Sequence, residues 1–252
     1  MTGVALHEPL NVLELFAGIG GLSLGLQRAG MRIVGHVEIN PFCRAVLHKH
    51  WPEVPAHDDV RTAIAWWRSQ PRPRVDVVAG GYPCQGESLL GERRGADDPR
   101  WLWPAMADVI ADLRPQYVIG ENVLGHRTKG LGTVLADLRR LNYAARAGVV
   151  RACAMGAAHP RARLFVLAHA EGGGCSPGFL DPRNHRPQTT DAQERAQPHR
   201  RDRWPAEPRM GRVADGVPAR MDRRTDRLAA LGNAVVPAVA EHIGRLITDE
   251  SR

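Results

Sequence analysis

The sequence has no long apolar run and few cysteines, and each of these shortages disfavours a class of protein. No apolar stretch approaches the roughly 20 residues that a membrane span requires, and the first residues lack the pattern of a signal peptide. The cysteines, Cys43, Cys84, Cys153 and Cys175, are scattered without a C-x-x-C pair, which disfavours a disulfide framework or a zinc site. We therefore expect a cytoplasmic protein with free thiols, no metal and no membrane partner.

The composition suits one large globular unit with an appendage. The chain has 252 residues, of which 43% are hydrophobic and 24% charged. Its net charge is +7, and of the 34 basic residues all but Lys49 and Lys129 are arginine. A basic chain favours a polyanionic partner, with nucleic acid as the first candidate. The arginine excess alone decides little, because it also fits GC-rich codon usage.

Short apolar runs alternate with helical patterns through the first two-thirds of the chain. The runs predict strands at residues 11–16, 32–37, 75–79, 117–120 and 164–168. Helical spacing lies between them at residues 22–28, 41–50, 101–113 and 134–141. This order predicts an α/β fold with a mostly parallel sheet, covered on both faces, that binds ligands at the carboxyl ends of its strands.

The composition changes near residue 171. Three glycines are followed by a stretch rich in proline and arginine with little apolar material for a core. Helical order returns near Leu228, and residues 235–247 have the pattern of an amphipathic helix. The predicted boundaries are a first domain at 1–170, a small loop-rich region at 171–221 and a C-terminal segment at 222–252.

A glycine-rich turn follows the first predicted strand. Gly18 and Gly20 fit the start of a dinucleotide fingerprint, but Ser23 occupies the third glycine position and disfavours NAD. Glu38 stands 20 residues after Gly18, where a carboxylate can accept hydrogen bonds from ribose hydroxyls. Together they indicate an adenosine-containing cofactor. The alternative is a turn needed only for helix packing, with a solvated Glu38.

Two other strands end in residues with reactive side chains. Cys84 lies in a tight Gly/Pro loop after one strand, where an α/β protein places a nucleophile. Glu121 and Asn122 end the next strand, and a buried carboxyl there could serve as an acid. The alternatives are a buried, unreactive thiol and residues that only cap a helix.

Five ordered motifs carry a specific resemblance. They are Leu13 to Gly21, Gly81 to Gln85, Glu121 to Val123, Pro160 to Phe165, and Leu231 to Pro237. In order and spacing the chain resembles the C5-cytosine DNA methyltransferase family over about residues 10–169 and 220–247, and most of all its compact phage or prophage members. The resemblance implies an S-adenosylmethionine-dependent methyltransferase Rossmann-like sheet, with target recognition in the small region at 171–221.

The resemblance also implies roles for individual residues. Cys84 would add to C6 of a flipped-out cytosine, Glu121 would bind N3, and Arg163, with Arg161 nearby, would orient the base. Phe16 would pack on the adenine of S-adenosylmethionine, and Glu38 would bind its ribose. The other implied cofactor contacts are Gly18, Gly20, Asp59, Val60, Pro83, Asn233, Ala234 and Val235. Double-stranded DNA is the implied partner, with a cognate restriction endonuclease possible and a monomer expected.

One departure from the family pattern keeps other functions open. Gly86-Glu87-Ser88 stands where family members usually have Pro-Phe-Ser. A non-catalytic DNA-binding relative is therefore one alternative, although Cys84, Glu121, Arg161 and Arg163 are all retained. A tRNA cytosine methyltransferase is another, but the Cys-Phe-Thr tripeptide of that related group is missing. A hydroxymethylating nucleotide enzyme would not need the glycine turn paired with Glu38.

Overall fold

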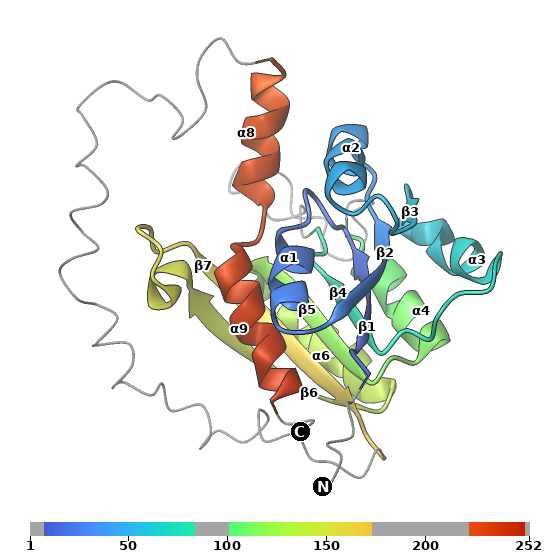
Figure 1. Ribbon diagram of the computed structural model, residues 1–252. Coiled ribbons are helices and arrows are strands. Elements are labelled where there is room, and N and C mark those ends of the chain that lie inside the picture. The colour runs from blue at the N-terminus through green and yellow to red at the C-terminus, as the bar shows by residue number, and fades with distance from the viewer. Residues whose placement is uncertain (1–7, 84–100, 173–221, 250–252) are drawn as a thin grey trace, which may run out of the picture.

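A central sheet organises the computed structural model of the protein, which describes residues 8–83, 101–172 and 222–249 (Figure 1). In these residues seven strands follow the order β3-β2-β1-β4-β5-β7-β6. Neighbouring strands are parallel except β7, which runs antiparallel to both β5 and β6. The strands are β1 (Asn11–Leu15), β2 (Arg32–Val37), β3 (Ala56–His57), β4 (Val77–Gly80), β5 (Tyr117–Val123), β6 (Tyr143–Arg151) and β7 (Ala162–Ala170).

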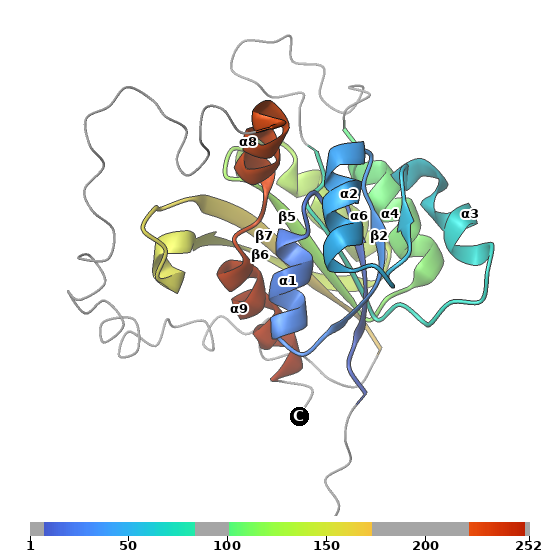
Figure 2. The same ribbon diagram turned by 45° about the horizontal axis from the view of Figure 1, so that its top comes forward.

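Helices cover both faces of this sheet (Figures 1 and 2). The helices of the described residues are α1 (Gly21–Arg28), α2 (Pro41–His50), α3 (Ala63–Arg68), α4 (Trp103–Leu113), α5 (His126–Lys129), α6 (Leu131–Arg140), α8 (Arg224–Asn233) and α9 (Pro237–Thr248), with 3-10 turns η1 (Val60–Thr62) and η3 (Ala152–Met155). Of these, α8 projects away from the sheet (Figure 1). One apolar core joins the sheet to α3, α4 and α6, and a second joins it to α1 and α9. The predicted mostly parallel sheet covered on both faces is confirmed.

Side chains of the central strands alternate between the two cores. In β5, Val118 belongs to the core under α4, whereas Tyr117 and Ile119 belong to the core under α1 and α9. Each of the three is at most 5% exposed. A strand buried on both faces reads as a continuous apolar run rather than an alternating one, which is why the central strands were visible in the sequence.

α9 packs on α1 through small residues, although the two helices lie far apart in the sequence. A Cβ added to Gly25 would overlap the Cβ of Ala240, and one added to Gly244 would lie 2.6 Å from the Cβ of Ala29. Ile243 and Ile247 of α9 are at most 2% exposed in the same core. The C-terminal segment is thereby held against the first helix of the fold.

Several elements differ from expectation. β2 and α2 have the expected bounds, but β3, α3 and β6 were not predicted. β6 is an edge strand with exposed residues at its centre, and between Tyr143 and Val149 its sequence is only alanine, arginine and glycine, so it has little apolar periodicity to detect. β5 also runs further than expected and contains Glu121 and Asn122.

The predicted domain boundaries remain predictions. Of the region at 171–221, all but Glu171 and Gly172 lies outside the described residues. Among the helices that the structure does describe, none is long and apolar enough to cross a membrane.

Candidate active site

The turn between β1 and α1 forms one side of the candidate site. Phe16, Gly18 and Gly20 adopt φ angles of 55°, 55° and 82°, a region that suits glycine and strains phenylalanine. α1 begins at Gly21, directly after the turn, so its first backbone N–H groups lie at this edge of the sheet. A Cβ added to Gly18 would meet nothing within 4 Å among the described residues. A ligand therefore has room to approach the backbone at Gly18.

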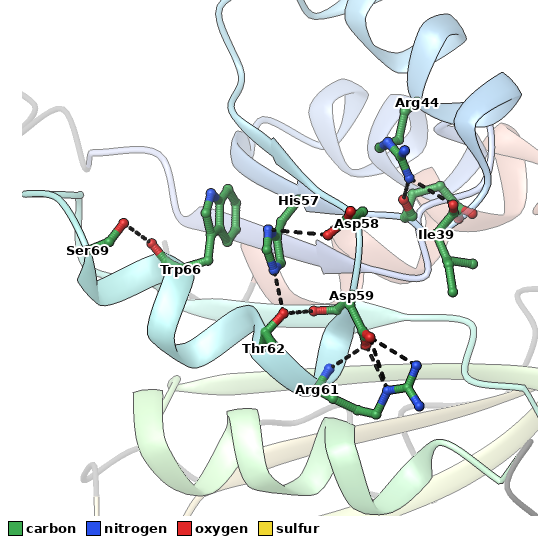
Figure 3. Close-up of polar contacts among 10 residues, drawn as sticks. Ile39, Arg44, His57, Asp58, Asp59, Arg61, Thr62, Trp66 and Ser69 are labelled. Atoms are coloured by element: carbon green, nitrogen blue, oxygen red, sulfur yellow. Dashed lines mark hydrogen bonds and ion pairs between the residues drawn. The ribbon is translucent and has the colours of Figure 1, made fainter.

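Glu38 lies beside this turn, directly after β2. Its carboxylate is buried and accepts hydrogen bonds from the backbone N–H groups of Gly18 and Asn40, each at 2.7 Å. Arg44 donates to the carbonyls of Glu38 and Ile39, each at 2.8 Å, and so fixes the backbone that carries the carboxylate (Figure 3). Each carboxylate oxygen can accept a second hydrogen bond, so Glu38 can still bind a hydroxyl.

Asp59 follows β3 and caps η1 (Figure 3). Its carboxylate accepts hydrogen bonds from the backbone N–H and the guanidinium of Arg61, and these lower the pKa of Asp59. The side chain is 31% exposed, so a charged oxygen remains within reach of a ligand. Val60 is buried in the core, which leaves its backbone for any ligand contact.

The chain returns to the glycine turn between α8 and α9. A Cβ added to Gly21 would overlap the carbonyl oxygen of Val235, so this segment lies directly on the first residue of α1. Asn233 ends α8, and Ala234 is extended at φ −63° and ψ 142°. The structure therefore brings Val235 of the predicted C-terminal motif against the turn at the N-terminal end of the chain, with Asn233 and Ala234 directly before it in the sequence.

Arg161 connects the start of β7 to this returning segment. Its Nη2 atom donates to the carbonyls of Gly232 and Ala234, each at 2.7 Å. Its backbone has φ 21°, outside the usual range for an arginine. The family resemblance implies that Arg161 lies near the base beside Arg163, and this remains a prediction. In the structure the hydrogen bonds of its Nη2 atom go to the C-terminal segment.

Glu121 and Arg163 form a buried ion pair on the other side of the site. Nε of Arg163 lies 3.1 Å from Oε1 of Glu121, and the two side chains are 21% and 10% exposed. Burial raises the pKa of Glu121 to about 6, and the charges of Arg163 and Arg161 oppose that rise. A carboxyl with this pKa can hold or release a proton near neutral pH.

The segment 81–83 lies against β5 at this ion pair. The side-chain amide of Asn122 donates to the carbonyl of Tyr82 at 2.9 Å, and a Cβ on Gly81 would lie 2.9 Å from Oε2 of Glu121. Pro83 is the last described residue before the next gap. Asn122 was predicted only as a strand-end or capping residue, and its hold on the loop backbone is a contact that the sequence did not reveal.

Cys84, the predicted nucleophile, lies outside the described residues, as does the departure at Gly86-Glu87-Ser88. Their positions relative to Glu121 therefore remain predictions.

Aromatic rings surround Tyr82, the middle residue of the segment 81–83. Its ring centroid lies 6.1 Å from Trp101, 5.1 Å from Trp103 and 5.3 Å from the buried His126. The indole N–H of Trp103 donates to Asp137 of α6 at 2.9 Å. In the sequence, the run Trp-Leu-Trp at 101–103 could have indicated this aromatic cluster, but it predicted only the start of a helix.

A buried polar chain underlies the glycine turn and was also missed. Ser23 of α1 contacts the carboxyl of Glu14 in β1, and its hydroxyl lies 2.9 Å from Nε2 of His36 in β2. Each of the three side chains belongs to a residue at most 2% exposed. The available signal was a glutamate inside the apolar run of the first strand.

The site combines a glycine turn backed by a carboxylate with a carboxyl–guanidinium pair. The C-5 cytosine-specific DNA methylase family matches residues 10–208, and the chain belongs to this family. The fold is accordingly the S-adenosylmethionine-dependent methyltransferase Rossmann-like sheet that the motifs predicted.

Individual relatives cover part of the chain. The type II methyltransferase M1.HphI of Haemophilus parahaemolyticus is 32% identical over 174 residues, which make up 65% of this chain and 47% of that protein. M.AplI of Arthrospira platensis is 34% identical over 167 residues, with the same coverage of 65% and 47%. The chain thus spans about half the length of the curated relatives it matches.

A solved structure agrees with these sequence relatives. A protein described as a DNA modification methyltransferase encoded within a prophage of Escherichia coli is 28% identical, with a TM-score of 0.54. The match covers 64% of this chain and 47% of that one. The predicted resemblance to the family is thereby confirmed.

Proposed function

We propose that the protein transfers a methyl group from S-adenosylmethionine to C5 of a cytosine in double-stranded DNA. The proposal depends mainly on one observation: two structural features of the site lie at the carboxyl edge of the sheet. One is the glycine turn with Glu38, and the other is the buried Glu121–Arg163 pair. Membership of the methylase family and relatives named as type II methyltransferases support the same activity.

The residues at the glycine turn fit an adenosine-containing cofactor. Open space at Gly18 lies next to a carboxylate with acceptor positions to spare. Glu38 would bind the ribose hydroxyls, Phe16 would pack on the adenine and Asp59 would accept from its amino group. Bound there, S-adenosylmethionine supplies an electrophilic methyl group. The proposed contacts of Gly20, Val60, Pro83, Asn233, Ala234 and Val235 complete the site.

Cys84 would make cytosine reactive at C5. Its thiolate forms a bond to C6, and the electron pair of the C5–C6 double bond makes C5 nucleophilic. After methylation, loss of the C5 proton and cleavage of the bond between sulfur and C6 restore the aromatic ring. C6 is inaccessible inside a duplex, so the cytosine must first be flipped into the site.

Glu121 would stabilise the adduct by holding a proton at N3 of the base. Its pKa of about 6 suits that role, because the carboxyl can be protonated at modest cost near neutral pH. Arg163 fixes the orientation of Glu121 and places positive charge beside the base. Recognition of the target sequence by the region at 171–221 is part of the proposal.

DNA containing 5-fluorocytosine tests this function, because fluorine at C5 blocks the elimination that releases the enzyme. We expect the wild-type protein, with S-adenosylmethionine, to form a covalent complex that survives denaturing electrophoresis. Cys84→Ser should form none. Cys153→Ser is the matched control, since Cys153 is an exposed free thiol away from the motif, and it should trap DNA as the wild type does.

Two results would contradict the proposal. Trapping by Cys84→Ser would show that another residue is the nucleophile. Binding of DNA by the wild type without trapping or methyl transfer would favour the non-catalytic DNA-binding relative. Replacing the DNA with tRNA in the same assay separates the remaining alternative, a tRNA cytosine methyltransferase.

A further inference from the structure

We propose that Arg161 is a positioning residue between two parts of the site. One is the returning segment beside the glycine turn, on the cofactor side, and the other is the Glu121–Arg163 pair, on the base side. The guanidinium of Arg161 holds the returning segment by the carbonyls of Gly232 and Ala234. The inference rests on the proposed function, because it assigns a role toward the cofactor and the base. It assigns Arg161 a different task from Arg163, whose guanidinium pairs with Glu121.

The carbonyls that Arg161 binds belong to the end of one helix and the link to the next. α8 ends at Asn233 and α9 begins at Pro237, so residues between them leave the helical hydrogen-bond pattern. The half-buried carbonyl of Ala234 needs a partner, and the Nη2 atom of Arg161 supplies it while also binding the exposed carbonyl of Gly232, each at 2.7 Å. Charged donors form stronger hydrogen bonds than neutral ones, so Arg161 can fix the path of this link.

The path of the link matters because it lies on the glycine turn. The carbonyl of Val235 occupies the space that a Cβ on Gly21 would need. Figure 2 shows the connection from α8 to α9 running beside the start of α1. A displacement of the link would therefore change the wall of the proposed cofactor site without changing the turn itself.

Arg161 also belongs to the charged group at the base side. Only Ala162 separates it from Arg163, and the positive charges of both arginines act on Glu121. A single guanidinium is therefore close enough to influence Glu121 while its hydrogen bonds hold the C-terminal link. One side chain therefore contacts the link beside the glycine turn and also adds positive charge at Glu121.

The test compares Arg161→Ala and Arg161→Lys with a matched control, Arg114→Ala. Arg114 likewise donates to a backbone carbonyl, that of Leu141, but it follows α4, away from the returning segment. Two measurements are made on the full chain. One is amide hydrogen exchange over residues 234–239, and the other is the calorimetric Kd for S-adenosylhomocysteine, the demethylated product.

We expect Arg161→Ala to exchange residues 234–239 faster and to raise the Kd for S-adenosylhomocysteine about tenfold or more, as loss of charged hydrogen bonds implies. Its KM for S-adenosylmethionine should rise more than its kcat falls. Arg161→Lys should recover part of the affinity, and Arg114→Ala should match the wild type in both measurements.

Other outcomes are equally decisive. Unchanged exchange in Arg161→Ala overturns the proposed hold on the segment. Faster exchange with an unchanged Kd overturns the role toward the cofactor. A wild-type protein that binds no S-adenosylhomocysteine contradicts the proposed function itself, while the exchange measurement still decides whether Arg161 holds the link.

Discussion

At the scale of single residues, the buried polar chain of Glu14, Ser23 and His36 contains two titratable groups with strongly shifted pKa values. Burial raises the pKa of Glu14 to about 8, and burial lowers the pKa of His36 to about 4. Ser23 has one hydroxyl proton and lies between both groups. The hydroxyl of Ser23 donates to Oε2 of Glu14 and lies 2.9 Å from Nε2 of His36. With Glu14 protonated and His36 neutral, this buried chain carries no charge.

This arrangement predicts how stability depends on pH. Because the pKa of Glu14 is raised on folding, its contribution to the free energy of unfolding is complete below pH 4.5. That contribution is lost as the pH rises toward 8. Because the pKa of His36 is lowered on folding, its contribution to the free energy of unfolding is complete above pH 6.5 and is lost only as the pH falls below that value. Between pH 6.5 and 8, only Glu14 of these two groups therefore alters the free energy of unfolding, which it lowers by about 1.4 kcal/mol per pH unit.

We expect the free energy of unfolding of the wild type to fall by about 2 kcal/mol between pH 6.5 and 8 because of Glu14. Glu14→Gln should remove most of that fall, since an amide does not ionise and its carbonyl oxygen can still accept from Ser23. Urea denaturation at the two pH values measures the difference. Glu53→Gln changes an exposed carboxyl and should behave as the wild type does. An equal fall in Glu14→Gln would show that Glu14 is already ionised at pH 6.5.

At the scale of elements, the closeness of α1 and α9 depends on glycine where the helices cross. The Cβ position of Gly25 is occupied by Ala240 and by the backbone of Pro237 and Glu241. These atoms cannot move aside as a flexible side chain would. Gly132, in α6, has nothing within 4 Å of its Cβ position among the described residues.

Two glycine-to-alanine changes separate packing from helix propensity. Gly25→Ala should lower the free energy of unfolding by about 1 to 3 kcal/mol through overpacking, although alanine favours a helix more than glycine does. Gly132→Ala should leave stability unchanged or raise it by up to about 1 kcal/mol. Chemical denaturation of both variants gives the comparison. Similar effects at the two positions would mean that α1 and α9 pack less closely than described.

At the scale of the whole molecule, the core under α1 is completed by residues from the far end of the chain. Ile243 is 2% exposed and packs in the same core as Leu22 and Leu26 of α1. The first and last described helices should therefore unfold together as one cooperative unit.

Ile243→Ala should lower the free energy of unfolding by about 2 to 4 kcal/mol, because it leaves a cavity in this core. Amide exchange should become faster in α1 as well as in α9, since the two share the lost contacts. Arg245→Ala alters an exposed residue of the same helix, paired with Glu241, and should cost less than about 1 kcal/mol. Faster exchange confined to α9 would contradict the single cooperative unit.

Local patterns in the sequence were enough for much of the fold and part of the site. β2 and α2 were predicted with the bounds they have, because an apolar run and helical spacing are signals within a few residues. The glycine turn and Glu38 were also found from spacing alone, and the hydrogen bond from Gly18 to Glu38 accounts for that spacing. Five ordered motifs were sufficient to predict the family that the comparisons confirm.

Contacts between distant segments were decided only by the tertiary structure. Arg161 reaches a segment about 70 residues further along the chain, and no local pattern distinguishes it from Arg163. β6 forms a strand because it pairs with β7, since its own residues lack a strand pattern. Glu14, Ser23 and His36 come from three elements that meet only when α1 folds onto β1 and β2. Sequence determines such features through the whole fold, because their energies depend on burial and on partners that local spacing does not specify.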